Sequence, residues 1–169
     1  YKTKAKTSYE VKTVVNEVLE GKDDLSDLEK AKLLYKYVVE EIRYSSVGFR
    51  QDGVVPQKAS KVINTRIGDC KDVATLFNAL CNEIGLKTEI VLVNTRDNGQ
   101  KDLYLPGIGF NHAISKVWID GKIYYVELTS DFNPFSTFGT SLKKAFVLDI
   151  NSDTEGSKPQ FLNPKTAIM

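Results

Sequence analysis

Residues 68–85 read GDCKDVATLFNALCNEIG, and this stretch predicts the helix around which the rest of the fold is organised. Asp69 is a good N-cap because its carboxylate can accept hydrogen bonds from first-turn N–H groups, and Asp72 stands three residues further on. Gly85 is a typical residue for the end of a helix. Cys70 is thereby placed in the first turn. The apolar residues recur at helical spacing and form one broad face: Val73, Leu76, Phe77, Leu80, Cys81 and Ile84.

The sequence upstream predicts three further helical segments. Residues 8–20 carry valines at helical spacing. Ser26 and Glu29 form an S-x-x-E capping box, which predicts a long helix over about 27–43. Residues 57–65 predict a short helix.

Downstream of Gly85 the pattern changes to β-branched and apolar residues, which are typical of strands. Strands are expected over 86–95, 112–119, 122–129 and 143–150, and the Asp-Gly pair at 120–121 predicts a two-residue hairpin turn. Helices that precede strands favour an α+β fold with an antiparallel sheet.

Length predicts one domain, over residues 1–150. Residues 151–169 are polar with Pro and Gly, and they indicate a tail or a linker to a neighbouring domain. Because the chain starts without Met, we expect it to be a piece of a longer multidomain protein.

Composition excludes several classes of function. The net charge is +1, so there is no basic field for nucleic acid. No apolar run approaches the roughly 20 residues of a membrane-spanning helix, and the first ten residues contain no signal-peptide core. Cys70 and Cys81 would lie about 16 Å apart on one helix, too far for a disulfide. With His112 as the single histidine, no metal or cofactor motif is recognisable.

Cys70 is the candidate nucleophile. The positive end of the helix dipole favours a thiolate over a thiol, and the free backbone N–H of a first-turn residue can stabilise an oxyanion. Gly68 would allow close approach of a substrate to the backbone. We therefore expect Cys70 to be exposed at the base of a cleft. The alternative is a buried structural cysteine, which is the interpretation we give to Cys81.

His112 and Glu127 are predicted to share one face of the hairpin. With the turn at 120–121, His112 lies opposite Thr129, and Glu127 is its diagonal neighbour at about 7–8 Å between Cα atoms. A carboxylate there could orient the imidazole toward a thiol. The alternative is that Glu127 pairs with Lys116, its other diagonal neighbour.

The stretch 43–139 resembles the transglutaminase-like superfamily, within the papain-like cysteine enzymes. The motifs that carry the resemblance are GDCKD at 68–72, FNH at 110–112, RY at 43–44, and G-x-x-P at 53–56. The sequence looks closest to a bacterial subgroup with GDCKD as its nucleophile motif.

The resemblance implies a papain-like core, in which the helix bearing the nucleophile packs on an antiparallel sheet bearing the histidine and the acid. Cys70 and His112 match the nucleophile and the base. The family usually has Asp-Pro-Thr fifteen residues after the histidine, where this chain has Glu127-Leu128-Thr129. Glu127 is the expected acid, and Asp131 is the alternative on the same predicted face.

The family's oxyanion partner is usually an upstream side chain, for which Tyr44 and Gln57 are candidates; a packed tyrosine and a solvated glutamine are the alternatives. The resemblance implies acyl transfer or amide hydrolysis through a thioester on Cys70, with no cofactor. The implied substrate is a protein or peptide, reacting at a glutamine carboxamide or a peptide amide. A periplasmic or cell-surface location is expected. An inactive binding module on the same fold is the competing hypothesis.

Overall fold

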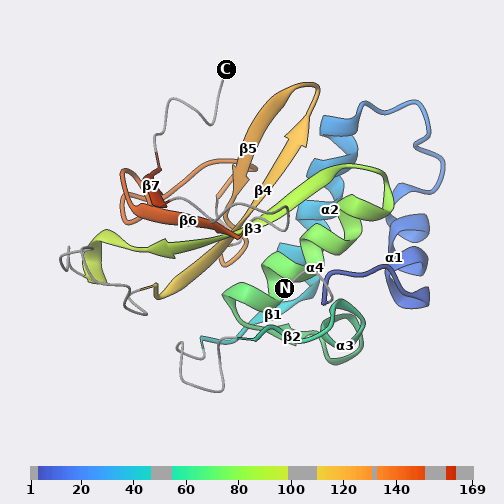
Figure 1. Cartoon of the computed structure of the whole chain (residues 1–169). Helices are drawn as coiled ribbons and strands as arrows, with labels where there is room; N and C mark the ends of the chain where they lie inside the picture. Colours follow the sequence, from blue (N-terminus) through green and yellow to red (C-terminus); the bar gives the residue numbers. More distant parts are fainter. Residues whose placement is uncertain (1–3, 47–54, 99–109, 131–132, 151–158, 163–169) are drawn as a thin grey trace.

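The computed structural model describes residues 4–46, 55–98, 110–130, 133–150 and 159–162. It has the predicted α+β architecture, with four helices gathered on one side of a five-stranded antiparallel sheet (Figure 1). The helices are α1 (Tyr9–Leu19), α2 (Asp27–Glu41), α3 (Ala59–Thr65) and α4 (Cys70–Glu83). The strands are β1 (Arg43–Tyr44), β2 (Ile67–Gly68), β3 (Lys87–Asn94), β4 (His112–Ile119), β5 (Lys122–Val126), β6 (Phe146–Ile150) and β7 (Pro159–Phe161), with a short 3-10 turn at Arg96–Asn98.

The predicted capping box of α2 is present, and the predicted N-cap of α4, Asp69, forms a capping box with Asp72 as well. Ser26 accepts from the backbone N–H of Glu29, whose carboxylate accepts from the N–H of Ser26 in return. Asp69 caps α4 by accepting from the backbone N–H groups of Lys71 and Asp72. Each box satisfies N–H groups that a helix start leaves without an intrahelical partner.

Helix α2 ends at Glu41, two residues before the predicted end at Arg43. The reason is a parallel pairing that the sequence pattern did not indicate: β1 pairs with β2, with Arg43 opposite Ile67 and Tyr44 opposite Gly68. This two-stranded sheet draws Tyr44 to the residues that immediately precede Cys70.

The larger sheet has the strand order β5-β4-β3-β6-β7. The β4–β5 hairpin has the predicted register, from Ile119 opposite Lys122 to Ser115 opposite Val126. Asp120 and Gly121 both have positive φ, 51° and 74°, as the two central residues of a type I′ turn require.

The C-terminal part of the sheet departs from the expected pattern in two ways. Strand β6 begins at Phe146, three residues later than predicted. Residues 159–161, within the predicted tail 151–169, form β7 and pair with β6, and Leu162 beside them is buried. These residues are therefore part of the sheet, while the domain limit at residue 150 stays a prediction.

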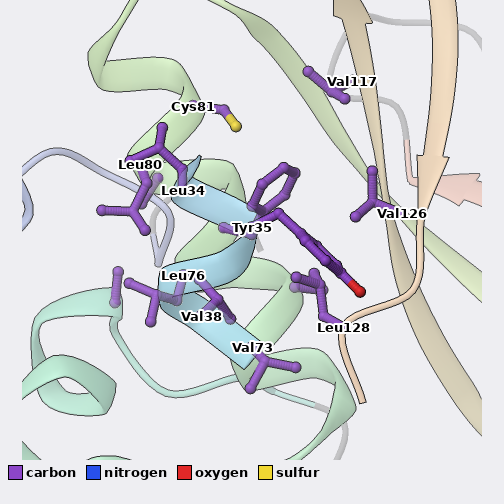
Figure 2. Packing of buried hydrophobic residues seen from close by; sticks show 14 of the residues in the cluster. Leu34, Tyr35, Val38, Val73, Leu76, Leu80, Cys81, Val117, Val126 and Leu128 are labelled. Carbon is purple, nitrogen blue, oxygen red and sulfur yellow. The ribbon is translucent and has the colours of Figure 1, made fainter. Parts of the chain in front are cut away.

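Helix α4 lies at the centre of the molecule. It contacts β3 and β4 on one side and the other three helices around it (Figure 1). Figure 2 shows apolar side chains of α4, among them Leu76 and Leu80, in one buried cluster with Leu34 of α2 and Val117 of β4. All four are fully buried, so the helix that carries Cys70 is held rigidly by the main core. Within the described residues, no helix has both the length and the apolar character needed to cross a membrane.

Candidate functional site

Cys70 is the first residue of α4, directly after its N-cap Asp69. The predicted helix start is thus confirmed, but the expected exposure is not, because Cys70 is only 4% exposed. Tyr44 lies close enough to Cys70 for a charge on the thiol to raise the pKa of the Tyr44 phenol, and the Cys70 sulfur hydrogen-bonds with His112, so β1 and β4 both bring a side chain to the thiol. The side chains of Tyr44 and His112 cover the thiol, which is consistent with the low exposure of Cys70.

His112 and Glu127 are in direct contact, with His112 Nε2 2.7 Å from Glu127 Oε2. Both side chains are largely buried, at 13% and 6% exposed. Since Nε2 faces Glu127, Nδ1 is the ring nitrogen left for the thiol of Cys70.

The other carboxylate oxygen of Glu127 accepts three hydrogen bonds from the two residues that follow it. Oε1 accepts from the backbone N–H groups of Leu128 and Thr129 and from the Thr129 hydroxyl, at 2.8 to 2.9 Å. These local bonds end β5 at Val126, so the predicted continuation of the strand to Thr129 is wrong. The expected pairing of His112 with Thr129 does not form, and Glu127 reaches the histidine from the segment directly after β5 instead of from the strand.

Electrostatics favour the charged form of both partners. Burial alone would lower the pKa of His112, but hydrogen bonds with Cys70 and Glu127, and the charges of both, outweigh it and raise the pKa to about 10. Burial would likewise raise the pKa of Glu127, yet the contacts with His112 and Thr129 lower it. At neutral pH the pair is therefore an imidazolium beside a carboxylate.

The alternative partner for Glu127 is excluded. The ammonium of Lys116 lies 2.7 Å from a carboxylate oxygen of Asp149 and 3.8 Å from one of Glu89. It belongs to a separate cluster that joins β3, β4 and β6. Asp131, the other candidate acid, lies outside the described residues.

Tyr44 sits beside the thiol and remains partly open to solvent, at 39% exposed. Burial, followed by the charge of Cys70, raises the pKa of its phenol to about 12. The hydroxyl consequently keeps its proton over the physiological range and can act as a hydrogen-bond donor.

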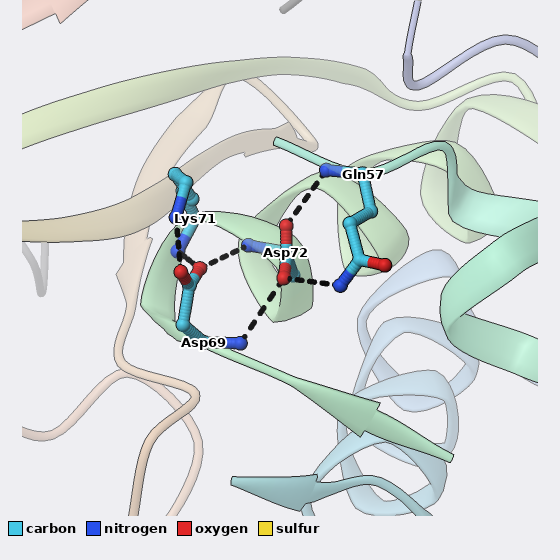
Figure 3. Close-up of polar contacts among 4 residues, drawn as sticks. All are labelled: Gln57, Asp69, Lys71 and Asp72. Atoms are coloured by element: carbon cyan, nitrogen blue, oxygen red, sulfur yellow. Dashed lines mark hydrogen bonds and ion pairs between the residues drawn. The ribbon is translucent and has the colours of Figure 1, made fainter. Parts of the chain in front are cut away.

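Gln57 is tied to α4 (Figure 3). Its backbone N–H and its side-chain Nε2 each donate to the Asp72 carboxylate at 2.8 Å, and the same carboxylate accepts from the N–H of Asp69 at 3.2 Å. Gln57 is therefore a half-buried residue whose side-chain amide binds Asp72, and it helps to hold the first turn of α4. Asp69 completes the network through a buried ion pair with Lys71.

Gly68 has a different role from the one expected. A Cβ atom at this position would lie 2.9 Å from the Cβ of Asp72. The lack of a side chain thus makes room for α4 itself.

The two residues before His112 anchor the start of β4. Phe110 stacks on Phe146 of β6, with ring centroids 6.2 Å apart. The Asn111 side chain accepts from the backbone N–H of Thr95 and donates to its hydroxyl. Sequence reasoning recognised this motif but not its partners, which come from residues after β3 and from β6.

Two further observations concern the second thiol and possible metal ligands. Cys81 is fully buried, and that burial raises the pKa of its thiol, so it is not a competing nucleophile. Within the described residues, no cluster of His, Cys, Asp and Glu side chains could hold a metal ion.

Comparison with known proteins now places the chain in a family. The model of the transglutaminase-like superfamily matches residues 12–128, which hold α4, β4 and Glu127. The chain therefore belongs to the transglutaminase-like superfamily. No curated protein shows significant similarity to it.

Solved structures share the fold at low sequence identity. The structure of "a putative protease" from Parabacteroides distasonis ATCC 8503 superposes with a TM-score of 0.69 at 16% identity, over 96% of this chain and 30% of the other. The structure of "a putative cysteine protease" from Cytophaga hutchinsonii gives a TM-score of 0.53 at 16% identity, over 90% of this chain and 57% of the other. The chain thus spans 30% of the length of the Parabacteroides distasonis protein and 57% of the length of the Cytophaga hutchinsonii protein.

Proposed function

We propose that this domain is a cysteine enzyme that cleaves or exchanges amide bonds through a thioester on Cys70. The observation that carries the proposal is the 2.7 Å contact between His112 and Glu127, made by an imidazole that also hydrogen-bonds with the thiol of Cys70. A nucleophile, a base and a buried carboxylate that orients the base are the parts that thiol catalysis needs.

In the first half of the reaction, the Cys70 thiolate attacks the carbonyl carbon of an amide, and the C=O π electrons move to the oxygen. The backbone N–H of Cys70 and the hydroxyl of Tyr44 are the donors we assign to this oxyanion. When the oxyanion collapses, the C–N bond breaks, and His112 gives its proton to the leaving amine. The product is a thioester with a neutral His112.

In the second half, water or an amine attacks the thioester. His112 removes the proton from this acceptor, and the Cys70 thiolate leaves as the C–S bond breaks. Water gives hydrolysis and an amine gives acyl transfer. Glu127 holds the imidazole in the same orientation in both halves, because its Oε2 faces Nε2 while Oε1 is fixed by hydrogen bonds from the two residues that follow it. The substrate we infer is a protein or peptide, reacting at a glutamine carboxamide or a backbone amide.

One observation favours a second candidate function. Cys70 is 4% exposed, which is low for a nucleophile that must meet a large substrate. An inactive binding module on this fold would tolerate a covered thiol, whereas an enzyme must uncover it when the substrate binds.

Selective alkylation distinguishes the two candidates. The protein is treated with iodoacetamide at pH 7, and mass spectrometry follows Cys70 and Cys81 separately, so Cys81 serves as an internal control. We expect Cys70 to react at least tenfold faster than Cys81, and His112→Asn to slow labelling of Cys70 alone. Cys70→Ala should abolish labelling at that site and leave the fold intact.

The enzymatic proposal fails if Cys70 in the folded protein reacts no faster than Cys81. It also fails if His112→Asn leaves the Cys70 rate unchanged, because the imidazole would then have no influence on the thiol.

A further inference from the structure

A groove of about 620 Å³ opens beside the candidate site, between the end of α2, the β1–β2 pair and the segment after β5. Two of its lining residues also belong to the site. Tyr44 is the phenol next to Cys70, and Thr129 donates twice to Glu127. A substrate that reaches Cys70 from this direction must therefore run along the groove.

Among the described lining residues, each of the two carboxylates, Glu40 and Glu41, forms an ion pair with a nearby cation. Glu40 lies 3.8 Å from the ammonium of Lys36, and Glu41 lies 3.3 Å from the guanidinium of Arg66. Arg66 also donates to the hydroxyl of Tyr37, at 3.0 Å. Its guanidinium is thus occupied by contacts on the outer side of α2.

Arg43 is the exception among the groove's charged residues. Its backbone N–H is used in the β1–β2 pairing, but its guanidinium makes no ion pair or hydrogen bond with any residue that the structure describes. The side chain is exposed and lies one residue before Tyr44. Once the paired charges are set aside, the lining residues that the structure describes carry one uncompensated positive charge.

Part of the lining suits an aliphatic stem, beside the hydroxyl groups of Thr65, Thr129 and Ser130. Tyr44 and Ile67 are each 39% exposed, which marks them as large apolar side chains facing solvent, and Leu128 forms part of the same wall. An apolar wall beside a free guanidinium is complementary to a short hydrocarbon chain that ends in a carboxylate, which Arg can bind through two parallel hydrogen bonds.

We propose that this groove is a substrate subsite in which Arg43 binds a carboxylate of the peptide substrate. The carboxylate is an acidic side chain or a free chain terminus close to the amide that reacts. The inference rests on the proposed function, since it assigns substrate preference to the same site. It makes Arg43 a specificity-determining residue and leaves the chemistry at Cys70 unchanged.

Protection of Cys70 from iodoacetamide tests the subsite without any need for turnover. The first pair of probes is acetyl-Ala-Ala-Glu-Ala-Ala-amide and its Gln twin, and the second is acetyl-pentaalanine as free acid and as amide. We expect at least one carboxylate probe to protect Cys70 at about tenfold lower concentration than its neutral twin, as befits a charge-assisted contact. The pair that shows the difference identifies the source of the carboxylate.

Arg43→Gln should remove this preference and leave the labelling rate without peptide unchanged. Lys58→Gln is the matched control, because it removes the same charge from an exposed side chain outside the groove, and it should keep the preference. The subsite is refuted if neither carboxylate probe surpasses its twin, or if the preference survives in Arg43→Gln. Failure of the proposed function would look different, because labelling of Cys70 would then be independent of His112 in the absence of peptide.

Discussion

At the scale of single residues, the two carboxylate oxygens of Glu127 have different partners. Oε1 accepts three hydrogen bonds from the two residues that follow it, and Oε2 is left for His112. A carboxylate fixed in this way has little freedom to rotate, so its orientation toward the imidazole does not depend on strand pairing.

Asp72 provides the first prediction at this scale. Its carboxylate accepts from the backbone N–H groups of Gln57 and Asp69 and from the Gln57 side chain. Asp72→Ala leaves these three donors, two part-buried and one buried, without their acceptor, and each costs about 1 kcal/mol. We expect the free energy of unfolding to fall by about 3 kcal/mol, as measured by urea denaturation.

Glu29→Ala is the matched control, because Glu29 holds the same position in the capping box of α2 but accepts nothing from outside its own helix start. It should cost about 1 kcal/mol. In addition, Asp72→Ala should cost about 1 kcal/mol less in a Gln57→Ala background, where one donor is already absent. Equal losses for Asp72→Ala and Glu29→Ala would show that Gln57 contributes nothing through Asp72.

At the scale of elements, the site depends on how β2 enters α4. Gly68 ends β2, and the first turn of α4 packs against it so closely that an added Cβ would lie 2.9 Å from the Cβ of Asp72 and 3.4 Å from a methyl of Val62. The strand and the helix can meet at this distance only because the residue between them has no side chain.

Gly68→Ala should therefore displace the first turn of α4. We expect a loss of about 1–3 kcal/mol in unfolding free energy, the usual cost of overpacking, together with a changed rate of Cys70 alkylation. Gly139→Ala is the control, because an added Cβ there meets only the Ser141 hydroxyl at 3.9 Å and its φ is not positive. A neutral Gly68→Ala would mean that the close contact is not required.

The elements also show what the sequence could and could not predict. The capping box of α2, the N-cap Asp69, the Asp120–Gly121 turn and the apolar face of α4 are local signals, and each predicted its element. The pairing of β1 with β2 joins residues more than twenty positions apart, and two-residue strands have no periodicity to detect. The end of β5 could not be predicted either, because it depends on which hydrogen bonds the Glu127 side chain makes with the next two residues.

The candidate site shows the same difference between features with a local sequence signal and features that depend on contacts between distant segments. Cys70 at a helix start and Glu127 within reach of His112 were accessible from spacing and register. The burial of Cys70 and the commitment of Gln57 to Asp72 were not, because both result from contacts between distant segments. The RY motif at 43–44 includes Arg43, but the motif does not indicate a free guanidinium, because that depends on how the neighbouring charges pair in the fold.

At the scale of the whole molecule, the charged pair links stability to pH. His112 begins β4, Glu127 follows β5, and the thiol belongs to α4, so the pair joins three elements that must pack together. The pKa of His112 is raised from its ordinary 6.5 to about 10, and the pKa of Glu127 is lowered from its ordinary 4.5. Each shift means that the folded state favours the charged form.

The signs follow from proton linkage. Above pH 6.5 the unfolded chain releases the His112 proton while the folded protein keeps it until about pH 10, so this contribution is full below 6.5 and is lost between 6.5 and 10. Below pH 4.5 the unfolded chain takes up a proton on Glu127 before the folded protein does, so the contribution of Glu127 is full above 4.5 and is lost as pH falls below it.

Glu127→Gln isolates these terms, because it keeps the size of the side chain and removes its charge. The advantage of the wild type over this variant in unfolding free energy should be constant between about pH 4.5 and 6.5 and should shrink on both sides. Glu41→Gln is the control, since the exposed Glu41–Arg66 pair is worth little and should give a nearly flat difference. Urea denaturation at several pH values between 3 and 10 provides the measurement. An advantage that stayed constant from pH 6.5 to 10 would mean that the Glu127 carboxylate does not hold the proton on His112, and the carboxylate would then be only the acceptor that ends β5.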